Sequence, residues 1–123
     1  PEGYDRFLSD LFEVQESLSP LDHIKKFEVI KGDASIELKK YLKKNPQTIF
    51  SLLYFDFDIY KPTLDCLELI KDHIVKGTVI GFDELIDDDS PGETLALKEA
   101  FDLKKISLKR YRYASRVSYF VVE

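Results

Sequence analysis

Apolar residues along the chain follow two spacings, which predict alternating helices and strands. A spacing of about three to four positions predicts helices over residues 4–18, 35–42, 62–76 and 93–101. Short apolar or β-rich runs predict strands over residues 27–30, 49–55, 78–82, 104–108 and 117–122. This order predicts an α/β fold whose sheet is mostly parallel and closes with a C-terminal antiparallel pair.

The run Ile49–Phe55 organises the rest of the pattern. Proline-containing turn segments bound it on both sides, so it is too short for a free helix and suits a strand buried on both faces. Asp56 and Asp58 follow it, one residue apart. A single acid often only solvates the end of a strand, but two neighbouring carboxylates raise the cost of ionising each other. Such a pair usually shares a cation or a proton.

A second apolar run, residues 78–82, also ends in two acids, Asp83 and Glu84. The helix predicted between the two runs completes a β-α-β unit, whose parallel strands bring their carboxyl ends to one edge of the sheet. We therefore expect the four carboxylates to meet there. Carboxylates without His or Cys nearby in the pattern suit a hard divalent cation such as Mg²⁺, Mn²⁺ or Ca²⁺.

A cation at this edge could lower the pKa of a substrate hydroxyl, and a nearby carboxylate could then remove the proton. Such chemistry activates a hydroxyl as a nucleophile. The alternative is a structural acidic cluster whose charges are balanced by Lys, Arg and helix N-termini. Both interpretations stay open at this point.

Composition limits the kinds of partner. The 123 residues fit one domain, and 18 Lys and Arg against 23 Asp and Glu give a net charge of −5, which argues against binding of nucleic-acid phosphates. No apolar run approaches the roughly 18 residues of a membrane span. Cys66 is the only cysteine, which excludes an internal disulfide and fits the cytoplasm. The expected partner is a small molecule, with no nucleic acid and no membrane, and a homo-oligomer stays open.

Four segments carry a resemblance to a known family. They are Gly32-Asp33-Ala34, Asp56-Phe57-Asp58-Ile59-Tyr60-Lys61-Pro62-Thr63, Gly77-Thr78-Val79-Ile80-Gly81-Phe82-Asp83-Glu84 and Pro91-Gly92-Glu93-Thr94. In order and spacing they look like the macrocin O-methyltransferase family, which belongs to the class I S-adenosylmethionine-dependent methyltransferases. The resemblance implies a Rossmann-like sheet and an O-methyltransferase that acts on a hydroxyl of a sugar or another small molecule.

The resemblance also implies roles for the four carboxylates. Asp56 and Asp83 match metal ligands of the family, with Mg²⁺ as the expected cation. Glu84 stands where the family usually has an Asp as third ligand, so this ligand has a longer arm. Asp58 matches the carboxylate proposed as general base.

On the cofactor side, Asp33 matches the acid that contacts the adenine of S-adenosylmethionine, with the backbone of Ala34 beside it. The family's first strand, its glycine-rich loop and its ribose-binding acid would all precede Pro1. Residues 1–123 are therefore expected to form the C-terminal part of a single catalytic domain, with the N-terminal strands missing. This part alone is expected to be inactive.

Two other functions stay open. Asp-x-Asp at the end of a strand also serves metal-dependent glycosyltransferases, although the second acidic pair and the Pro-Gly-Glu turn favour methyl transfer. A non-catalytic binding or assembly fragment is the other alternative, because the chain lacks a glycine-rich loop.

Overall fold

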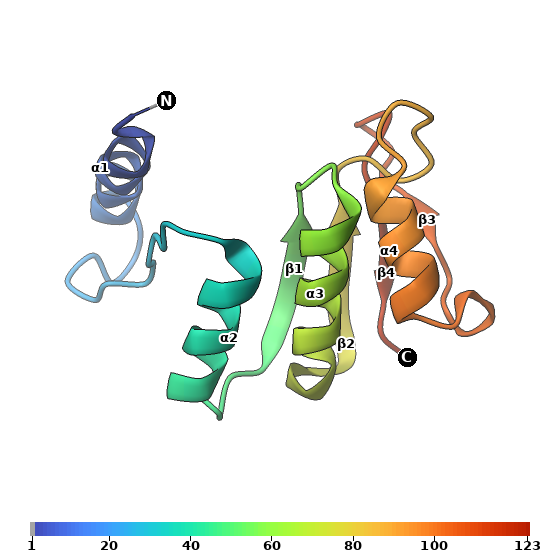
Figure 1. The fold of residues 1–123 in the computed structure, drawn as a ribbon. Coiled ribbons are helices and arrows are strands. Elements are labelled where there is room, and N and C mark those ends of the chain that lie inside the picture. The colour runs from blue at the N-terminus through green and yellow to red at the C-terminus, as the bar shows by residue number, and fades with distance from the viewer. Residues whose placement is uncertain (1) are drawn as a thin grey trace. The chain divides into compact units, whose positions relative to one another are not determined.

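The structure is a computed structural model that describes residues 2–123. It divides into two compact units, one that ends at Asp33 and one that comprises Ala34–Glu123. Figure 1 shows the helices and strands of both units. The single catalytic domain expected over residues 1–123 stays a prediction.

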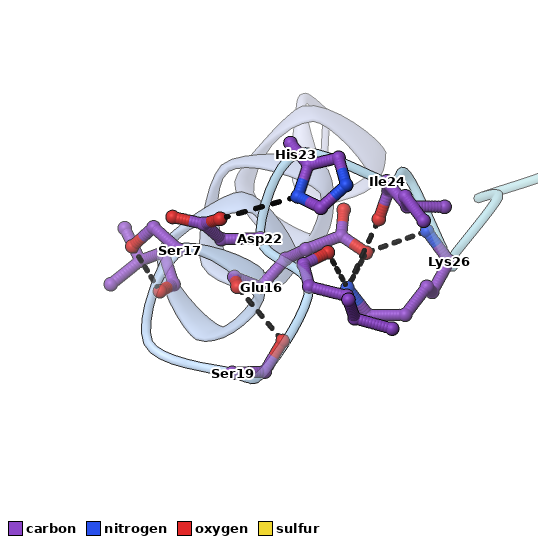
Figure 2. Close-up of polar contacts among 9 residues, drawn as sticks. Glu16, Ser17, Ser19, Asp22, His23, Ile24 and Lys26 are labelled. Atoms are coloured by element: carbon purple, nitrogen blue, oxygen red, sulfur yellow. Dashed lines mark hydrogen bonds and ion pairs between the residues drawn. The ribbon is translucent and has the colours of Figure 1, made fainter.

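The first unit is built around the helix α1, Tyr4–Ser17, which confirms the helix predicted there. The loop after α1 is tied back to the end of the helix, as Figure 2 shows. The ammonium of Lys26 lies 3.2 Å from Oε1 of Glu16 and also donates to two backbone carbonyl oxygens of the loop. The rings of Phe12 and Phe27 pack with centroids 5.4 Å apart. These contacts hold the loop on the helix that precedes it.

The prediction of a strand over residues 27–30 is wrong, since this segment forms no strand in the structure. A strand needs a neighbour that takes up its backbone hydrogen bonds. Among residues 2–33 the regular structure consists of α1 alone, which offers no such ladder. The apolar side chain of Phe27 packs on α1 instead.

The second unit contains a four-stranded mixed sheet. Its strands are β1 (Phe50–Phe55), β2 (Ile74–Phe82), β3 (Lys109–Arg110) and β4 (Ser118–Val121), in the order β1-β2-β4-β3. The strands β1 and β2 are parallel, as the β-α-β unit predicts, and β4 is antiparallel to both of its neighbours. The sheet is therefore mixed rather than mostly parallel, because the segment 27–30 adds no strand to it.

Helices cover one face of this sheet. The helical elements of the second unit are α2 (Ala34–Lys44), α3 (Tyr60–Ile70), the 3₁₀ helix η1 (Lys71–His73), α4 (Gly92–Ala100) and the 3₁₀ helix η2 (Leu103–Lys105). The three α-helices overlap the ranges predicted for them. Figure 1 shows α3 and α4 side by side in front of the strands.

The core lies between these helices and the sheet. Its large members include residues of three neighbouring strands, of α3 and α4, and of the loop after β2; they are Phe55, Ile80, Phe82, Phe120, Leu67, Ile70, Leu97 and Leu85. The rings of Phe55 and Phe82, which are partners across β1 and β2, stack with centroids 5.3 Å apart. Full burial of such a side chain stabilises the fold by about 1.5–3 kcal/mol. This packing fixes the register in which β1 and β2 end together.

The prediction that β1 is buried on both faces is wrong. The strand lies at an edge of the sheet, and while Leu53 and Phe55 face the core, Leu52 and Tyr54 are 64% and 52% exposed. Alternate residues of a strand point to opposite faces. Within residues 34–123 the packed helices cover only the face to which Phe55 belongs.

Gly77, predicted to end the helix over residues 62–76, lies inside β2 instead. Its φ of 97° falls where the pairing of β2 with β1 is irregular. The hydroxyl of Thr78 accepts a hydrogen bond from the N–H of Val75 across 3.0 Å and donates one to the carbonyl oxygen of Phe50 across 2.7 Å. Because these bonds satisfy backbone groups near the irregular register, β2 begins earlier than predicted.

The terminal antiparallel pair is present, but its first strand is displaced along the chain. The strand β4 confirms the last predicted strand, whereas β3 is Lys109–Arg110 rather than residues 104–108. Asp102 accounts for the difference. Its carboxylate accepts from the N–H of Lys104 across 3.1 Å and its carbonyl from the N–H of Lys105 across 2.9 Å, which starts the 3₁₀ helix η2.

Candidate active site

The two acidic strand ends lie at one edge of the sheet. Phe55 of β1 pairs with Phe82 of β2, and the N–H of Asp83 donates to the carbonyl oxygen of Phe55 across 2.9 Å. Asp56 and Asp83 are therefore the first residues past two strands that end side by side. The structure brings these two acids together at the carboxyl edge.

The negative charges of three neighbouring acids act on the carboxyl group of Asp56. Loss of hydration raises the pKa of the Asp56 carboxyl above its usual range, and the negative charges of Asp83, Asp58 and Glu84 raise it further. The part of this shift that comes from the neighbouring acids is repulsion that a positive charge would relieve. The site therefore favours a proton or a cation near Asp56.

Tyr54 holds Asp83, a contact that the sequence analysis missed. Its hydroxyl donates a hydrogen bond to Oδ1 of Asp83, and loss of hydration together with this bond raises the pKa of Tyr54 to about 12. The ring covers Gly81, where a Cβ atom would come within 3.1 Å of Cδ2 of Tyr54. The spacing in the strand could have indicated Tyr54 as a residue of the site. Tyr54 and Asp56 are two residues apart, and alternate residues of a strand share a face.

Glu84 has a different partner. Nη1 of Arg116, just ahead of β4, forms an ion pair with Glu84 and lies 3.2 Å from Oδ2 of Asp87. The bond to Glu84 and the charge of Asp87 raise the pKa of Arg116. Within residues 2–123, no group of three acidic, His or Cys side chains has an arrangement that could hold a metal ion. The sequence contained no signal for Arg116, which is 32 positions from Glu84.

Asp58 lies at a tight bend. Its φ of 60° is in the left-handed region, and the N–H of Ile59 donates to the carbonyl oxygen of Phe57 across 2.7 Å. Such a turn is strained for a residue other than glycine, although Asp tolerates it better than most. The Asp58 side chain is exposed. An exposed carboxylate on a strained turn beside Asp56 is a candidate for contact with a ligand.

Glu93, at the start of α4, is a further acid of this region and is fully buried. Its Oε1 accepts from the N–H of Phe57 across 3.0 Å, and its Oε2 accepts from the N–H of Glu84 across 3.3 Å. Burial raises the pKa of Glu93, while the N–H donors act in the opposite direction. The sequence analysis included Glu93 in a motif but assigned it no role.

The predicted cofactor residues Asp33 and Ala34 fall at the boundary between the two units. Asp33 is the last residue of the first unit, and Ala34 is the first residue of α2. Ala34 lines a mostly apolar hollow of about 220 Å³ together with Leu53, Phe55 and Phe57. Contact of Asp33 and Ala34 with an adenine stays a prediction.

Known structures resemble this chain closely. One is an apo structure of CalS11, a TDP-rhamnose 3'-O-methyltransferase of calicheamicin biosynthesis, and another is a crystal structure of the same enzyme. Each is 32% identical to this chain, with a TM-score of 0.91 over 98% of the chain. The chain therefore has the fold of the corresponding part of these methyltransferase structures. The chain spans about half the length of the CalS11 structures, 53% of one and 48% of the other.

No protein-family model and no curated protein sequence matches the chain. The likeness to CalS11 supports the methyltransferase part of the predicted resemblance. Membership of the macrocin O-methyltransferase family and a Rossmann-like sheet stay predictions. In the described residues 2–123, none of the helices has the length and apolar character needed to cross a membrane.

Proposed function

We propose that the protein to which this chain belongs is an S-adenosylmethionine-dependent O-methyltransferase whose acceptor is a hydroxyl of a sugar or another small molecule. The observation that carries the proposal is the likeness to CalS11, with a TM-score of 0.91 at 32% identity. The acids at the carboxyl edge of the sheet supply groups that suit hydroxyl activation. The same likeness favours methyl transfer over the glycosyl transfer that Asp-x-Asp could also serve.

Asp58 is the general base in this proposal. Its carboxylate is exposed at a bend next to the acidic cluster, where an acceptor could reach it from solvent. S-adenosylmethionine supplies an electrophilic methyl group when it is bound. Asp58 would take the proton of the acceptor hydroxyl, which leaves that oxygen free to act as the nucleophile.

Asp56 and Asp83 would hold a divalent cation, with Mg²⁺ as the candidate. Carboxylate oxygens are suitable donors for Mg²⁺. Loss of hydration raises the pKa of Asp56, and the negative charges of the neighbouring acids, which raise it further, are charges that a cation would balance. A bound cation would also lower the pKa of the acceptor hydroxyl. Glu84 could join them only by leaving Arg116; the Arg116 side chain is 58% exposed and that of Glu84 is 16% exposed.

Asp33 and Ala34 are proposed to bind the adenine of S-adenosylmethionine. The predicted resemblance assigns the methionine and ribose contacts to parts of the family's fold other than the four matching segments, so the acidic part of the site is what this chain is proposed to supply. The resemblance also leaves the acceptor unnamed. A cytoplasmic location and a homo-oligomer stay predictions.

Methyl transfer by the whole protein tests the proposal. With S-adenosylmethionine, Mg²⁺ and a panel of TDP-sugars, we expect S-adenosylhomocysteine and an O-methylated sugar, both detected by mass spectrometry. A chelator should slow the reaction, and added Mg²⁺ should restore it. Glu68→Gln, on the exposed side of α3, is the matched surface control for Asp58→Asn and should keep full activity. Absence of S-adenosylmethionine binding in calorimetry would contradict the proposal and favour a non-catalytic binding or assembly role.

A further inference from the structure

A single buried carboxylate joins the two loops that carry the acidic pairs. Glu93 accepts from the N–H of Phe57, which lies between Asp56 and Asp58, and from the N–H of Glu84, which follows Asp83. The N–H of Asp58 also stabilises the ionised carboxylate. Phe57 and Glu93 are 36 positions apart in the chain, so this contact is tertiary and not local.

The residues on either side of Glu93 hold the same two loops. Gly92 approaches the first loop so closely that an added Cβ atom would lie 2.5 Å from the carbonyl oxygen of Asp58. The hydroxyl of Thr94 accepts from the N–H of Ile86, in the second loop, across 2.8 Å. Residues 92–94 therefore contact both loops at the first turn of α4.

The chemistry of this position calls for a carboxylate. Its two oxygens accept from two separate loops. Burial disfavours a negative charge there, and the N–H donors and the N-terminal end of α4 act against that effect. Gln has the same shape but replaces one acceptor by an NH₂ donor, which would face a buried N–H. Asp keeps the charge, but it is shorter by one methylene group and cannot reach both donors from the same backbone position.

We propose that Glu93 is a positioning residue that fixes the loop carrying Asp56 and Asp58 relative to the loop carrying Asp83 and Glu84. It contacts neither a substrate nor a cation, and it acts through the backbone of the acidic loops. The catalytic consequence of this role rests on the proposed methyltransferase function. The positioning itself does not.

Amide hydrogen exchange of the ¹⁵N-labelled whole protein tests the positioning. In Glu93→Gln, exchange at Phe57 and Glu84 should rise by about 10–100-fold, because each amide loses a bond to a charged acceptor. Exchange at Ile80 and Phe120, in the core strands, should stay unchanged. Glu68→Gln makes the same chemical change on an exposed surface and should alter none of the four amides.

Glu93→Asp keeps the test decisive if Glu93→Gln does not fold. The shorter carboxylate should leave one of the two loops protected and release the other. Retained protection of both Phe57 and Glu84 in a folded variant of either kind would overturn the proposal.

Kinetics of the same variants test the consequence for catalysis. We expect kcat of Glu93→Gln to fall by about 10²-fold, with KM for S-adenosylmethionine nearly kept, because displaced groups lose their alignment while the cofactor contacts remain. A variant in which the amides of Phe57 and Glu84 exchange faster but kcat equals that of the wild type would overturn the role of Glu93 in the site. If the wild-type protein transfers no methyl group, the proposed function fails, and the exchange data alone then decide the role of Glu93.

Discussion

The hydroxyl of Tyr54 donates a hydrogen bond to Asp83 across the two parallel strands that end at the candidate site. Because the pKa of Tyr54 is raised to about 12, mainly by loss of hydration, the phenol keeps its proton at any ordinary working pH. Its ring lies over Gly81, where an added Cβ atom would come within 3.1 Å of the ring. One oxygen of Asp83 is thus oriented by the protein itself.

Tyr54→Phe keeps the ring over Gly81 and removes only the donor to Asp83. We expect the Mn²⁺ affinity of the whole protein to fall by roughly 10–100-fold, the usual cost of losing the partner of a metal ligand. Calorimetric titration measures this change. Tyr113→Phe removes the same hydroxyl from a side chain that is 80% exposed, and it should leave the affinity unchanged. Equal affinities in both variants would show that Tyr54 does not orient a metal ligand.

The β-α-β unit and its acidic ends could be predicted from the sequence, because each depends on residues close together in the chain. The run Ile49–Phe55 and its acids form one short segment, and the rule for parallel neighbours then brings two such segments to one edge. The contacts that complete the site could not be predicted. Arg116 contacts Glu84 at a separation of 32 positions in the sequence, and Glu93 contacts Phe57 at a separation of 36. A local sequence pattern cannot predict contacts between residues so far apart in the chain.

Two strand predictions failed because a strand depends on its partner as well as on its own residues. Residues 27–30 have a strand-like composition but no neighbouring strand in their unit. Residues 104–108 follow Asp102, whose carboxylate captures the N–H of Lys104 and turns the chain into a 3₁₀ helix. In both cases local contacts took the place of the expected ladder.

Asp56→Asn should stabilise the protein at neutral pH. Loss of hydration and the charges of Asp83, Asp58 and Glu84 raise the pKa of Asp56 above 3.8. Between 3.8 and the raised value the folded protein binds more protons than the unfolded chain, so the free energy of unfolding falls as the pH rises through this window. Above this pH window ionised Asp56 lowers the free energy of unfolding by its full amount, and below the window it has no such effect.

Urea denaturation with a chelator present checks this prediction. At pH 7 the midpoint of Asp56→Asn should exceed that of the wild type, and the difference should disappear as the pH falls toward 3.8. Asp72→Asn removes an exposed carboxylate from η1, and its midpoint should follow the wild type at both pH values. A lower midpoint for Asp56→Asn at pH 7 would mean that the repulsion at Asp56 is already balanced.

Arg116→Gln should strengthen cation binding. The substitution frees Glu84 from its ion pair and removes a positive charge from the edge where the cation is proposed to bind. The free energy of unfolding should also fall, because the Glu84 carboxylate, only 16% exposed, loses its charged partner. Titration with Mn²⁺ measures the affinity, and Arg112→Gln, also exposed, is the matched control. Weaker binding in Arg116→Gln than in Arg112→Gln would exclude Glu84 as a ligand that competes with Arg116.

Asp58→Asn tests the mechanism most directly, because Asn keeps the shape, tolerates a φ of 60° and cannot act as the base. We expect turnover to fall by roughly 10²–10⁴-fold, the usual contribution of a positioned general base, with cation and cofactor affinity nearly kept. Asp56→Asn should fail differently, since its weakened cation binding is partly overcome by added Mg²⁺. If Asp58 only ends its strand, Asp58→Asn should cost no more than modest stability. Turnover within a few-fold of wild type at saturating Mg²⁺ would therefore remove Asp58 from the catalytic role and leave Asp56 and Asp83 as the groups that act on the acceptor.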